Sequence, residues 1–186
     1  MTTQLPHWDM SVVYPGLQSP EFEAGFQSLV AQIDDLTALF DTHGVGAQPP
    51  AASPEETVAA AEAVITALNS VVDFASTIGA YVHAFVTTDT RDTTAQAANS
   101  RLDQQYTRLS LLETRFTAWI GALDLDALIA SSTIAADHAF ALRQIARAAQ
   151  HQMSPDEESL ASELSLSGSA AWTKLQGNVS SQQLVP

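Results

Sequence analysis

Apolar residues recur along this chain at spacings of three and four, the pattern of amphipathic α-helices. The first such stripe consists of Phe22, Phe26, Leu29, Ile33, Leu36 and Phe40. Ser19-Pro20 starts it, because a serine oxygen can satisfy an orphan backbone amide and proline has no amide to satisfy. We therefore predict a helix over residues 19–42, after an irregular, turn-rich N-terminal lead over residues 1–18 that holds Pro6, Trp8 and Tyr14-Pro15-Gly16.

Two longer helices are predicted over residues 54–88 and 91–122. No proline lies between Pro54 and Pro155, and the only glycines there are Gly79 and Gly121. Ser53-Pro54 with Glu56 forms a capping-box start signal, and Asp89 or Thr90 is expected to cap the next helix. The apolar positions of the first helix cover so wide an arc that it should have neighbours on two sides. Because a short polar turn joins the two helices, we predict an antiparallel hairpin as the spine of the fold.

Shorter helices should flank this hairpin. We predict one over residues 134–150, with Phe140, Leu142 and Ile145 on its apolar face. Another is predicted over residues 155–166, followed by a final stub that carries Trp172 and Leu175. Since no segment shows sustained strand alternation, the predicted fold is all-α, a helical bundle in which residues 19–186 form a single all-helical domain.

Composition excludes several functional classes. The chain has 186 residues, 46% of them hydrophobic, with a formal net charge of −14 and no cysteine. Such a negative charge opposes binding to a phosphate backbone, so no nucleic-acid partner is expected. Without cysteine there is no disulfide, thiolate zinc site or cysteine nucleophile. The N-terminus lacks the features of a signal peptide, and no run approaches about 18 consecutive apolar residues, so we expect a cytoplasmic protein with no membrane partner.

The five histidines do not form a recognisable metal or catalytic motif. None is followed by glutamate, so the H-E-x-x-H zinc-peptidase motif is absent. His138 and His151 would lie about 220° apart on a continuous helix and could not chelate together. His83 is interpreted as a hydrogen-bonded structural histidine rather than a buried general base, because no acid lies at i±4 to orient it. Asp137 precedes His138 directly, and adjacent helical residues do not face each other.

Acidic and basic clusters also have structural explanations. The acidic groups Glu55-Glu56 and Asp156-Glu157-Glu158 lie in the first turns of predicted helices, where negative charge complements the helix dipole. After Arg91, the three arginines Arg101, Arg108 and Arg115 are spaced seven residues from one another, with Asp103 and Glu113 nearby. We expect this arginine row to pair with acids across the hairpin. Gly-x-Ser-x-Gly and Ser-x-x-Lys nucleophile motifs are absent. No catalytic, cofactor-binding or metal-binding residue is therefore assigned.

Several stretches, in order along nearly the whole chain, resemble the N-terminal region of the oligoendopeptidase F family of zinc metallopeptidases. The resemblance begins in Leu5-Pro-His-Trp-Asp-Met-Ser-Val-Val-Tyr-Pro-Gly-Leu and continues in Ser19-Pro-Glu-Phe-Glu and Glu113-Thr-Arg-Phe-Thr-Ala-Trp. Later stretches are Asp137-His-Ala-Phe, Met153-Ser-Pro-Asp-Glu-Glu, Glu163-Leu-Ser-Leu-Ser-Gly and Ala171-Trp-Thr-Lys-Leu-Gln-Gly-Asn-Val-Ser-Ser. This ordered set is more specific than any single short motif.

The resemblance implies a helical metalloendopeptidase whose N-terminal half forms one wall of a deep channel for short peptides. In that family two histidines and a glutamate of the C-terminal half bind zinc, and the motif glutamate activates water. This sequence contains no H-E-x-x-H, so no catalytic residue and no zinc ligand is transferred to it. Our leading hypothesis is a channel-shaping N-terminal domain that works with a catalytic C-terminal domain, in cis or in trans.

Two alternatives come from other classes. The first is a free-standing helical interaction module that binds a protein partner, possibly the catalytic half in trans. The second is a small enzyme in its own right that uses His83 or His138, for which the sequence offers no visible triad or metal partner.

Overall fold

The computed structural model describes residues 9–49, 51–180 and 182. Within these residues there are helices and no strands, which confirms the all-α class. Pro6 and Trp8 of the predicted lead segment lie outside the described residues. The helices are α1 (Pro20–Thr42), α2 (Pro54–Thr88), α3 (Thr93–Ala122), α4 (Leu125–Ser131), α5 (Thr133–Asp137), α6 (Ala139–Ala149), α7 (Pro155–Ser167) and α8 (Ser169–Ser180).

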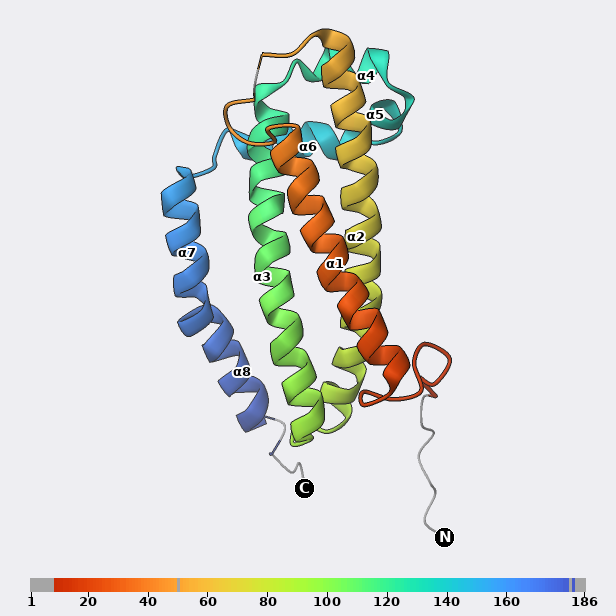
Figure 1. The fold of residues 1–186 in the computed structure, drawn as a ribbon. Coiled ribbons are helices and arrows are strands. Elements are labelled where there is room, and N and C mark those ends of the chain that lie inside the picture. The colour runs from red at the N-terminus through yellow and green to blue at the C-terminus, as the bar shows by residue number, and fades with distance from the viewer. Residues whose placement is uncertain (1–8, 50, 181, 183–186) are drawn as a thin grey trace.

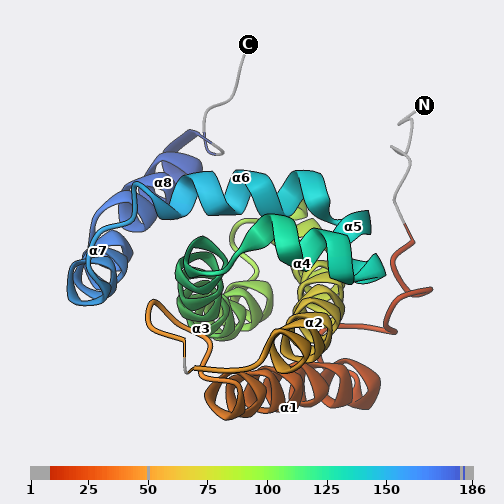
Figure 2. The ribbon, with the colours of Figure 1, turned by 90° about the horizontal axis from the view of Figure 1, so that it is seen from above.

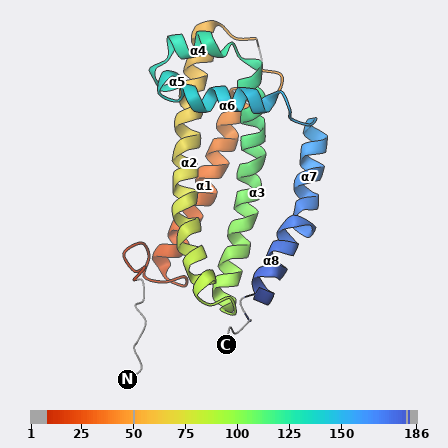
Figure 3. The same cartoon turned by 180° about the vertical axis from the view of Figure 1, so that it is seen from behind.

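Three long helices form the body of the molecule. In Figure 1, α1 and α3 run upward, and α2, which lies between them in the sequence, runs downward. Seen from above in Figure 2, α1 lies on one side of the α2 and α3 pair and α6 crosses on the opposite side. The view from behind shows α6 lying across α2 and α3, near the end of the bundle that carries α4 and α5 (Figure 3). The fold therefore has three layers, with α2 and α3 in the middle.

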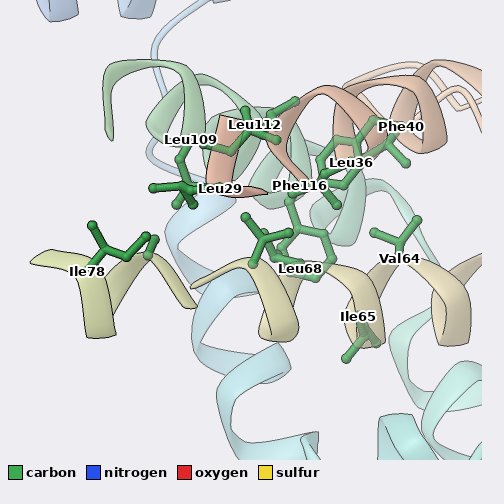
Figure 4. Packing of buried hydrophobic residues seen from close by; sticks show 14 of the residues in the cluster. Leu29, Leu36, Phe40, Val64, Ile65, Leu68, Ile78, Leu109, Leu112 and Phe116 are labelled. Carbon is green, nitrogen blue, oxygen red and sulfur yellow. The ribbon is translucent and has the colours of Figure 1, made fainter. Parts of the chain in front are cut away.

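The core lies where the long helices meet. All six residues of the predicted α1 stripe are buried, from Phe22 at 1% exposure to Phe40 at 0%. Figure 4 shows Leu29 and Leu36 of α1 gathered with Leu68 of α2 and Phe116 of α3. Burying side chains of this size removes apolar surface from water at roughly 25 cal/mol per Å². The packing of these stripes is consequently the main force that holds the three helices together.

Helix α2 is apolar over a wide arc because it contacts both other long helices. Val64 and Ile78 are completely buried, and so are Ala61 and Val82 on the neighbouring stripe. By length and averaged composition α2 could cross a membrane, since an 18-residue window has a mean hydropathy of 1.5. A count of consecutive apolar residues does not find this window, because polar residues interrupt the apolar ones along the helix. The core helix of a soluble protein passes the same test, so this helix alone does not decide the membrane question.

Several helix boundaries differ from the sequence-based expectations. Neither Asp89 nor Thr90 caps α3. Asp92 does so, because its Oδ1 accepts hydrogen bonds from the amides of Thr94 at 2.8 Å and Ala95 at 3.1 Å. Asp89 instead accepts from the amide of Arg91 within the preceding turn.

The helix predicted over residues 134–150 is divided. His138 ends α5 and begins α6, with backbone angles of φ −99° and ψ 10° that depart from helical values. The final stub is a complete helix, α8, which follows α7 directly across Gly168. Sequence periodicity did not reveal the division, because the apolar spacing continues through residue 138 while the backbone bends there.

An aromatic cluster fixes the described part of the lead segment to the lower end of the bundle. The ring centroid of Tyr14 lies 5.6 Å from that of Phe22 and 5.2 Å from that of Tyr81, both edge to face. The hydroxyl group of Tyr81 donates a 2.9 Å hydrogen bond to the carbonyl oxygen of Tyr14. Residues that precede α1 are thus anchored to α2 as well as to α1.

Candidate functional site: a groove between α2, α3 and α6

The position of α6 on α3 depends on two small residues. Gly121 near the end of α3 lies against Ala149 of α6, and a Cβ atom at position 121 would collide with the Ala149 side chain. Leu142 of α6 is buried at 2% exposure. A glycine is therefore needed at position 121 because of the close approach of the two helices.

A polar contact with α2 fixes the chain segment that leads into α5 and α6. The hydroxyl group of Ser132, a buried residue between α4 and α5, donates a 2.7 Å hydrogen bond to Glu62 Oε1. The same hydroxyl oxygen accepts a hydrogen bond from the amide of Ala135 and so caps α5. This serine therefore ties the start of the α5–α6 segment to the middle layer.

Between α6 and the middle layer is a cavity of about 320 Å³, which we call the α6 groove. Its walls are mostly apolar, and its polar members come from α2, from α3 and from the bend at His138 before α6. The lining residues are Ile65, Leu68, Asn69, Val72, Glu113, Phe116, Thr117, His138, Ala141, Leu142 and Ile145. A mostly apolar pocket with a few convergent polar groups is the usual form of a small-molecule site.

His138 is held by hydrogen bonds at both ring nitrogens. Its Nδ1 lies 2.8 Å from the carbonyl oxygen of Ile134, and its Nε2 lies 2.9 Å from Asn69 Nδ2. Because a carbonyl oxygen only accepts, Nδ1 carries the proton, and the unprotonated Nε2 accepts from the asparagine amide. His138 therefore acts as a structural link between α2 and the bend before α6, with both ring nitrogens in contact with the chain itself.

Among the residues that the structure describes, Glu113 is the only acid that lines the α6 groove. Its side chain makes no hydrogen bond or ion pair within the part of the chain that the structure describes. Loss of solvation beside the apolar walls raises the pKa of this carboxyl group above its ordinary value. The groove thus contains an exposed acid whose charge is compensated by no cation among the described residues.

The arginine row of α3 pairs with α1 and leaves Glu113 and Asp103 out. Arg101 forms a bidentate ion pair with Glu23, with two N···O distances of 2.9 Å. Further along, Arg108 pairs with Asp34, and Arg115 binds Asp41 at 2.8 Å. The expectation of pairing across the hairpin was wrong, because α1 lies alongside α3 and presents acids at the matching levels.

A second cavity, of about 490 Å³, lies between the loop after α1, the end of α3 and the segment after α6. Its main polar groups are already bound within the chain. Arg115 Nε donates to the carbonyl oxygen of Val45 at 3.1 Å, and Gln152 Nε2 donates to that of Thr114 at 3.1 Å. Glu158 Oε1 accepts from the amide of Met153. These contacts join the elements around the cavity and leave few polar groups for a ligand.

No metal site emerges in the described part of the chain. No group of three or more His, Asp or Glu side chains there is close enough to hold a metal ion. Glu56 and Glu157 accept hydrogen bonds from the amides of Ser53 and Ser154, which is the capping role predicted from sequence. The residues described here therefore do not fit the zinc ion that the family resemblance implies.

Two further sequence-based expectations need correction. The side chain of His83 is exposed, so it is neither a buried base nor a buried structural histidine. Phe140 does not contribute to the apolar contact face of α6, because 79% of its surface is exposed. His151 is exposed beyond the end of α6, whereas His138 lines the groove.

Helices α7 and α8 form an arm beside α3 (Figure 1). Several large apolar side chains of this arm are exposed to solvent. We call residues 155–180 the α7–α8 arm. Its exposed apolar residues are Leu160, Leu164, Leu166, Trp172, Leu175 and Val179, each at least 51% exposed. Loss of solvation raises the pKa of the Asp103 carboxyl group on α3 above its ordinary value, and the charge of Lys174 on α8 opposes part of this shift. The arm therefore follows α3 without burying its own apolar side chains.

Sequence reasoning missed the α6 groove. Asn69 lies on α2, Glu113 lies on α3 and His138 lies at the bend before α6; they are 25 to 69 residues apart and form no short motif. Helical periodicity identifies the apolar face of each helix but not the angle at which α6 crosses the middle layer. The only sequence signal was that Glu113 lies on a helix between the core positions Leu112 and Phe116.

Together these features define an all-helical domain with a groove under its outer layer and an exposed apolar arm. Residues 120–182 match the family model described as oligopeptidase F, for the N-terminal domain of that family. The match covers the end of α3 through the α7–α8 arm, about a third of the chain. Over these residues it confirms the resemblance to the N-terminal region of the oligoendopeptidase F family. Searches of curated proteins and of solved structures found no match.

Proposed function

We propose that this chain is the N-terminal helical domain of an oligoendopeptidase F-like metallopeptidase, acting in the cytoplasm. The observation that carries the proposal is the family match over residues 120–182. In this role the domain shapes one wall of a channel for short peptides. Zinc and its chemistry come from a catalytic C-terminal domain, because the described residues hold no cluster of metal ligands.

The α7–α8 arm supports a role in assembly with that catalytic domain. Six large apolar side chains on the arm are at least 51% exposed, and contiguous exposed apolar surface is typical of interfaces. The arm, residues 155–180, lies entirely inside the family match. The catalytic domain would cover these side chains, whether it follows in the same polypeptide or binds in trans.

The first test is the intact mass of the native product in its source cells, detected with an antibody raised against this region. A product several times larger than 19.8 kDa, containing a downstream H-E-x-x-H motif, supports a domain of a larger peptidase. A product near 19.8 kDa that binds no peptidase subunit contradicts the proposal. Fractionation of the same cells tests the cytoplasmic location.

A second test uses the purified chain directly. We expect it to bind no stoichiometric zinc and to cleave no peptide unless the catalytic domain is added. Zinc is measured by mass spectrometry of the metal content, and cleavage is measured with a mixed library of short peptides. Chelator-sensitive cleavage by this chain alone would contradict the proposed division of labour.

The second candidate function is a free-standing interaction module, and the exposed α7–α8 arm is the observation that favours it. A module of this kind would bind a protein partner other than a peptidase through its arm. The mass and the partners of the native product distinguish this candidate from the peptidase domain. An interaction module should have a mass near 19.8 kDa and should co-purify with a partner that lacks peptidase activity.

A further inference from the structure

The α6 groove has the size and wall chemistry of a small-ligand site. Its volume of about 320 Å³ lies in the range of such pockets. Ile65 and Leu68 of α2 and Phe116 of α3 form one side, and Leu142 and Ile145 of α6 form the other. A ligand that enters this groove must therefore have an apolar body.

Two polar side chains in the groove, Glu113 and Asn69, present acceptor atoms to which no described group of the chain donates, and both side chains are exposed to solvent. Glu113 has no cationic or hydrogen-bonding partner among the described residues. Asn69 uses its amide nitrogen toward His138, which leaves its carbonyl oxygen without a hydrogen bond in the described structure. Two acceptors from different helices thus line one groove, and neither is satisfied by the chain itself.

Charge decides the kind of ligand. An anion would be repelled by Glu113 and by the net charge of −14. A neutral apolar ligand would displace part of the water around the exposed carboxylate of Glu113 and would offer that carboxylate no donor in return. A cation with several N–H donors would compensate the charge of Glu113 and could also donate to Asn69 Oδ1.

We propose that the α6 groove binds an organic cation, an ammonium or guanidinium group carried on an apolar body, with Glu113 as the counter-ion and Asn69 as a second acceptor. This inference goes beyond the proposed peptidase relationship and does not rest on it. Desolvation of Glu113 in the unliganded groove is consistent with it, because a bound cation would favour the ionised form of that carboxyl group.

Calorimetric titration of the purified chain with matched probes tests the proposal. N-acetyl-Phe-Arg-amide supplies an apolar ring and a guanidinium group, and N-acetyl-Phe-citrulline-amide has nearly the same shape without the charge. We expect the arginine probe to bind about three to ten times more tightly than the citrulline probe. Glu113→Gln should abolish this preference, because it removes the charge while keeping the shape of the side chain.

Two further variants serve as controls. Asp103→Asn removes another acid of α3 whose pKa burial raises, but Asp103 does not line the groove, so the preference should persist. Ala141→Trp places a large side chain on an exposed position of α6 within the lining and should weaken both probes. Far-UV circular dichroism during heating checks that each variant folds, and Glu113 has no internal partner to lose.

Phenethylammonium chloride distinguishes a free small amine from a peptide side chain as the source of the cation. Glu113-dependent binding of this salt alone supports a free amine, and Glu113-dependent binding of the arginine probe alone supports a peptide. The proposal is overturned if neither probe binds up to about 10 mM. Equal binding of the arginine and citrulline probes, or a preference that survives Glu113→Gln, overturns it as well.

Discussion

At the scale of single residues, one tyrosine explains why α2 contains a glycine in its interior. Tyr106 of α3 lays its ring across α2, and its hydroxyl group donates a 3.0 Å hydrogen bond to the carbonyl oxygen of Ala75. The hydroxyl group lies where a Cβ atom at Gly79 would be. Gly79 is thus retained because of this close approach, although glycine weakens a helix by about 1 kcal/mol relative to alanine.

Gly79→Ala should therefore lower the free energy of unfolding, by about 1 kcal/mol, instead of raising it. The alanine methyl group displaces the Tyr106 hydroxyl group and breaks its hydrogen bond to Ala75. Urea denaturation measures the effect. In a Tyr106→Phe background the obstructing hydroxyl group is gone, and the same substitution should be less harmful. A gain in stability from Gly79→Ala in the original sequence would show that the ring moves aside without cost.

The Glu23–Arg101 ion pair predicts a pH dependence. Hydrogen bonds from Arg101 lower the pKa of Glu23 from 4.5 to about 2 in the folded chain. Because the folded pKa is the lower one, the stabilisation is fully present above pH 4.5 and is lost as the pH falls toward 2. Both side chains are partly exposed, so Glu23→Gln should cost only about 0.5 kcal/mol at neutral pH.

This cost should shrink between pH 4.5 and 2, as chemical denaturation at each pH would measure. Asp35→Asn is the matched control, because Asp35 carries the same charge on the same helix without an ion pair in the described structure. A cost that stays constant down to pH 2 would assign the effect to packing of Glu23 and not to its charge.

At the scale of elements, the starts of α1 and α2 show how local chemistry sets the boundaries. Ser19 Oγ accepts a hydrogen bond from the amide of Phe22. Ser53 Oγ accepts from the amide of Glu56, and Glu56 returns a contact to the amide of Ser53. In both cases proline follows the serine, so the orphan amides of the first turn are satisfied without help from the rest of the fold.

Ser53→Ala should lower the stability of the domain by about 1 kcal/mol, because it leaves the amide of Glu56 without its side-chain acceptor. Thermal unfolding followed by circular dichroism measures this change. Ser70→Ala is the control, since Ser70 is exposed in the middle of the same helix and caps nothing. Equal effects of the two substitutions would remove the capping explanation.

These local signals explain how much of the fold the sequence could predict. The all-α class and the buried stripe of α1 follow from periodicity, and the cap of α2 follows from Ser53-Pro54 with Glu56. The bend at His138 could not be predicted, because it depends on a contact with Asn69 from another helix. The α6 groove and the partners of the α3 arginines could not be predicted for the same reason. Both depend on how helices that are far apart in the sequence pack against each other.

At the scale of the whole molecule, the layers differ in how completely they are packed. The three long helices bury their apolar stripes, whereas the α7–α8 arm exposes Trp172 at 71% and Leu164 at 59%. Side chains of the arm therefore add little to the stability of the isolated domain. Their surface makes the arm the region most prone to contact with other molecules.

Replacing Leu164 and Trp172 together by glutamine should change the free energy of unfolding by less than about 0.5 kcal/mol. The same variant should bind less of an apolar fluorescent dye, because it removes exposed apolar surface. Leu142→Gln is the contrasting control, since it buries an amide in the core and should cost several kcal/mol. A large loss of stability in the arm variant would show that the arm packs inside the domain.

The ion pairs between α1 and α3 also bear on the order in which the chain folds during synthesis. They join residues 74 to 78 positions apart, and α1 contributes acids only, while the compensating arginines are on α3. As the polypeptide leaves the ribosome from its N-terminus, α1 emerges with an acidic face and an apolar stripe that have no complete set of partners. Helix α1 can pack against α2 as soon as that helix has emerged, but its acids stay unpaired until the third long helix has been made, so these ion pairs are among the last contacts of α1 to form.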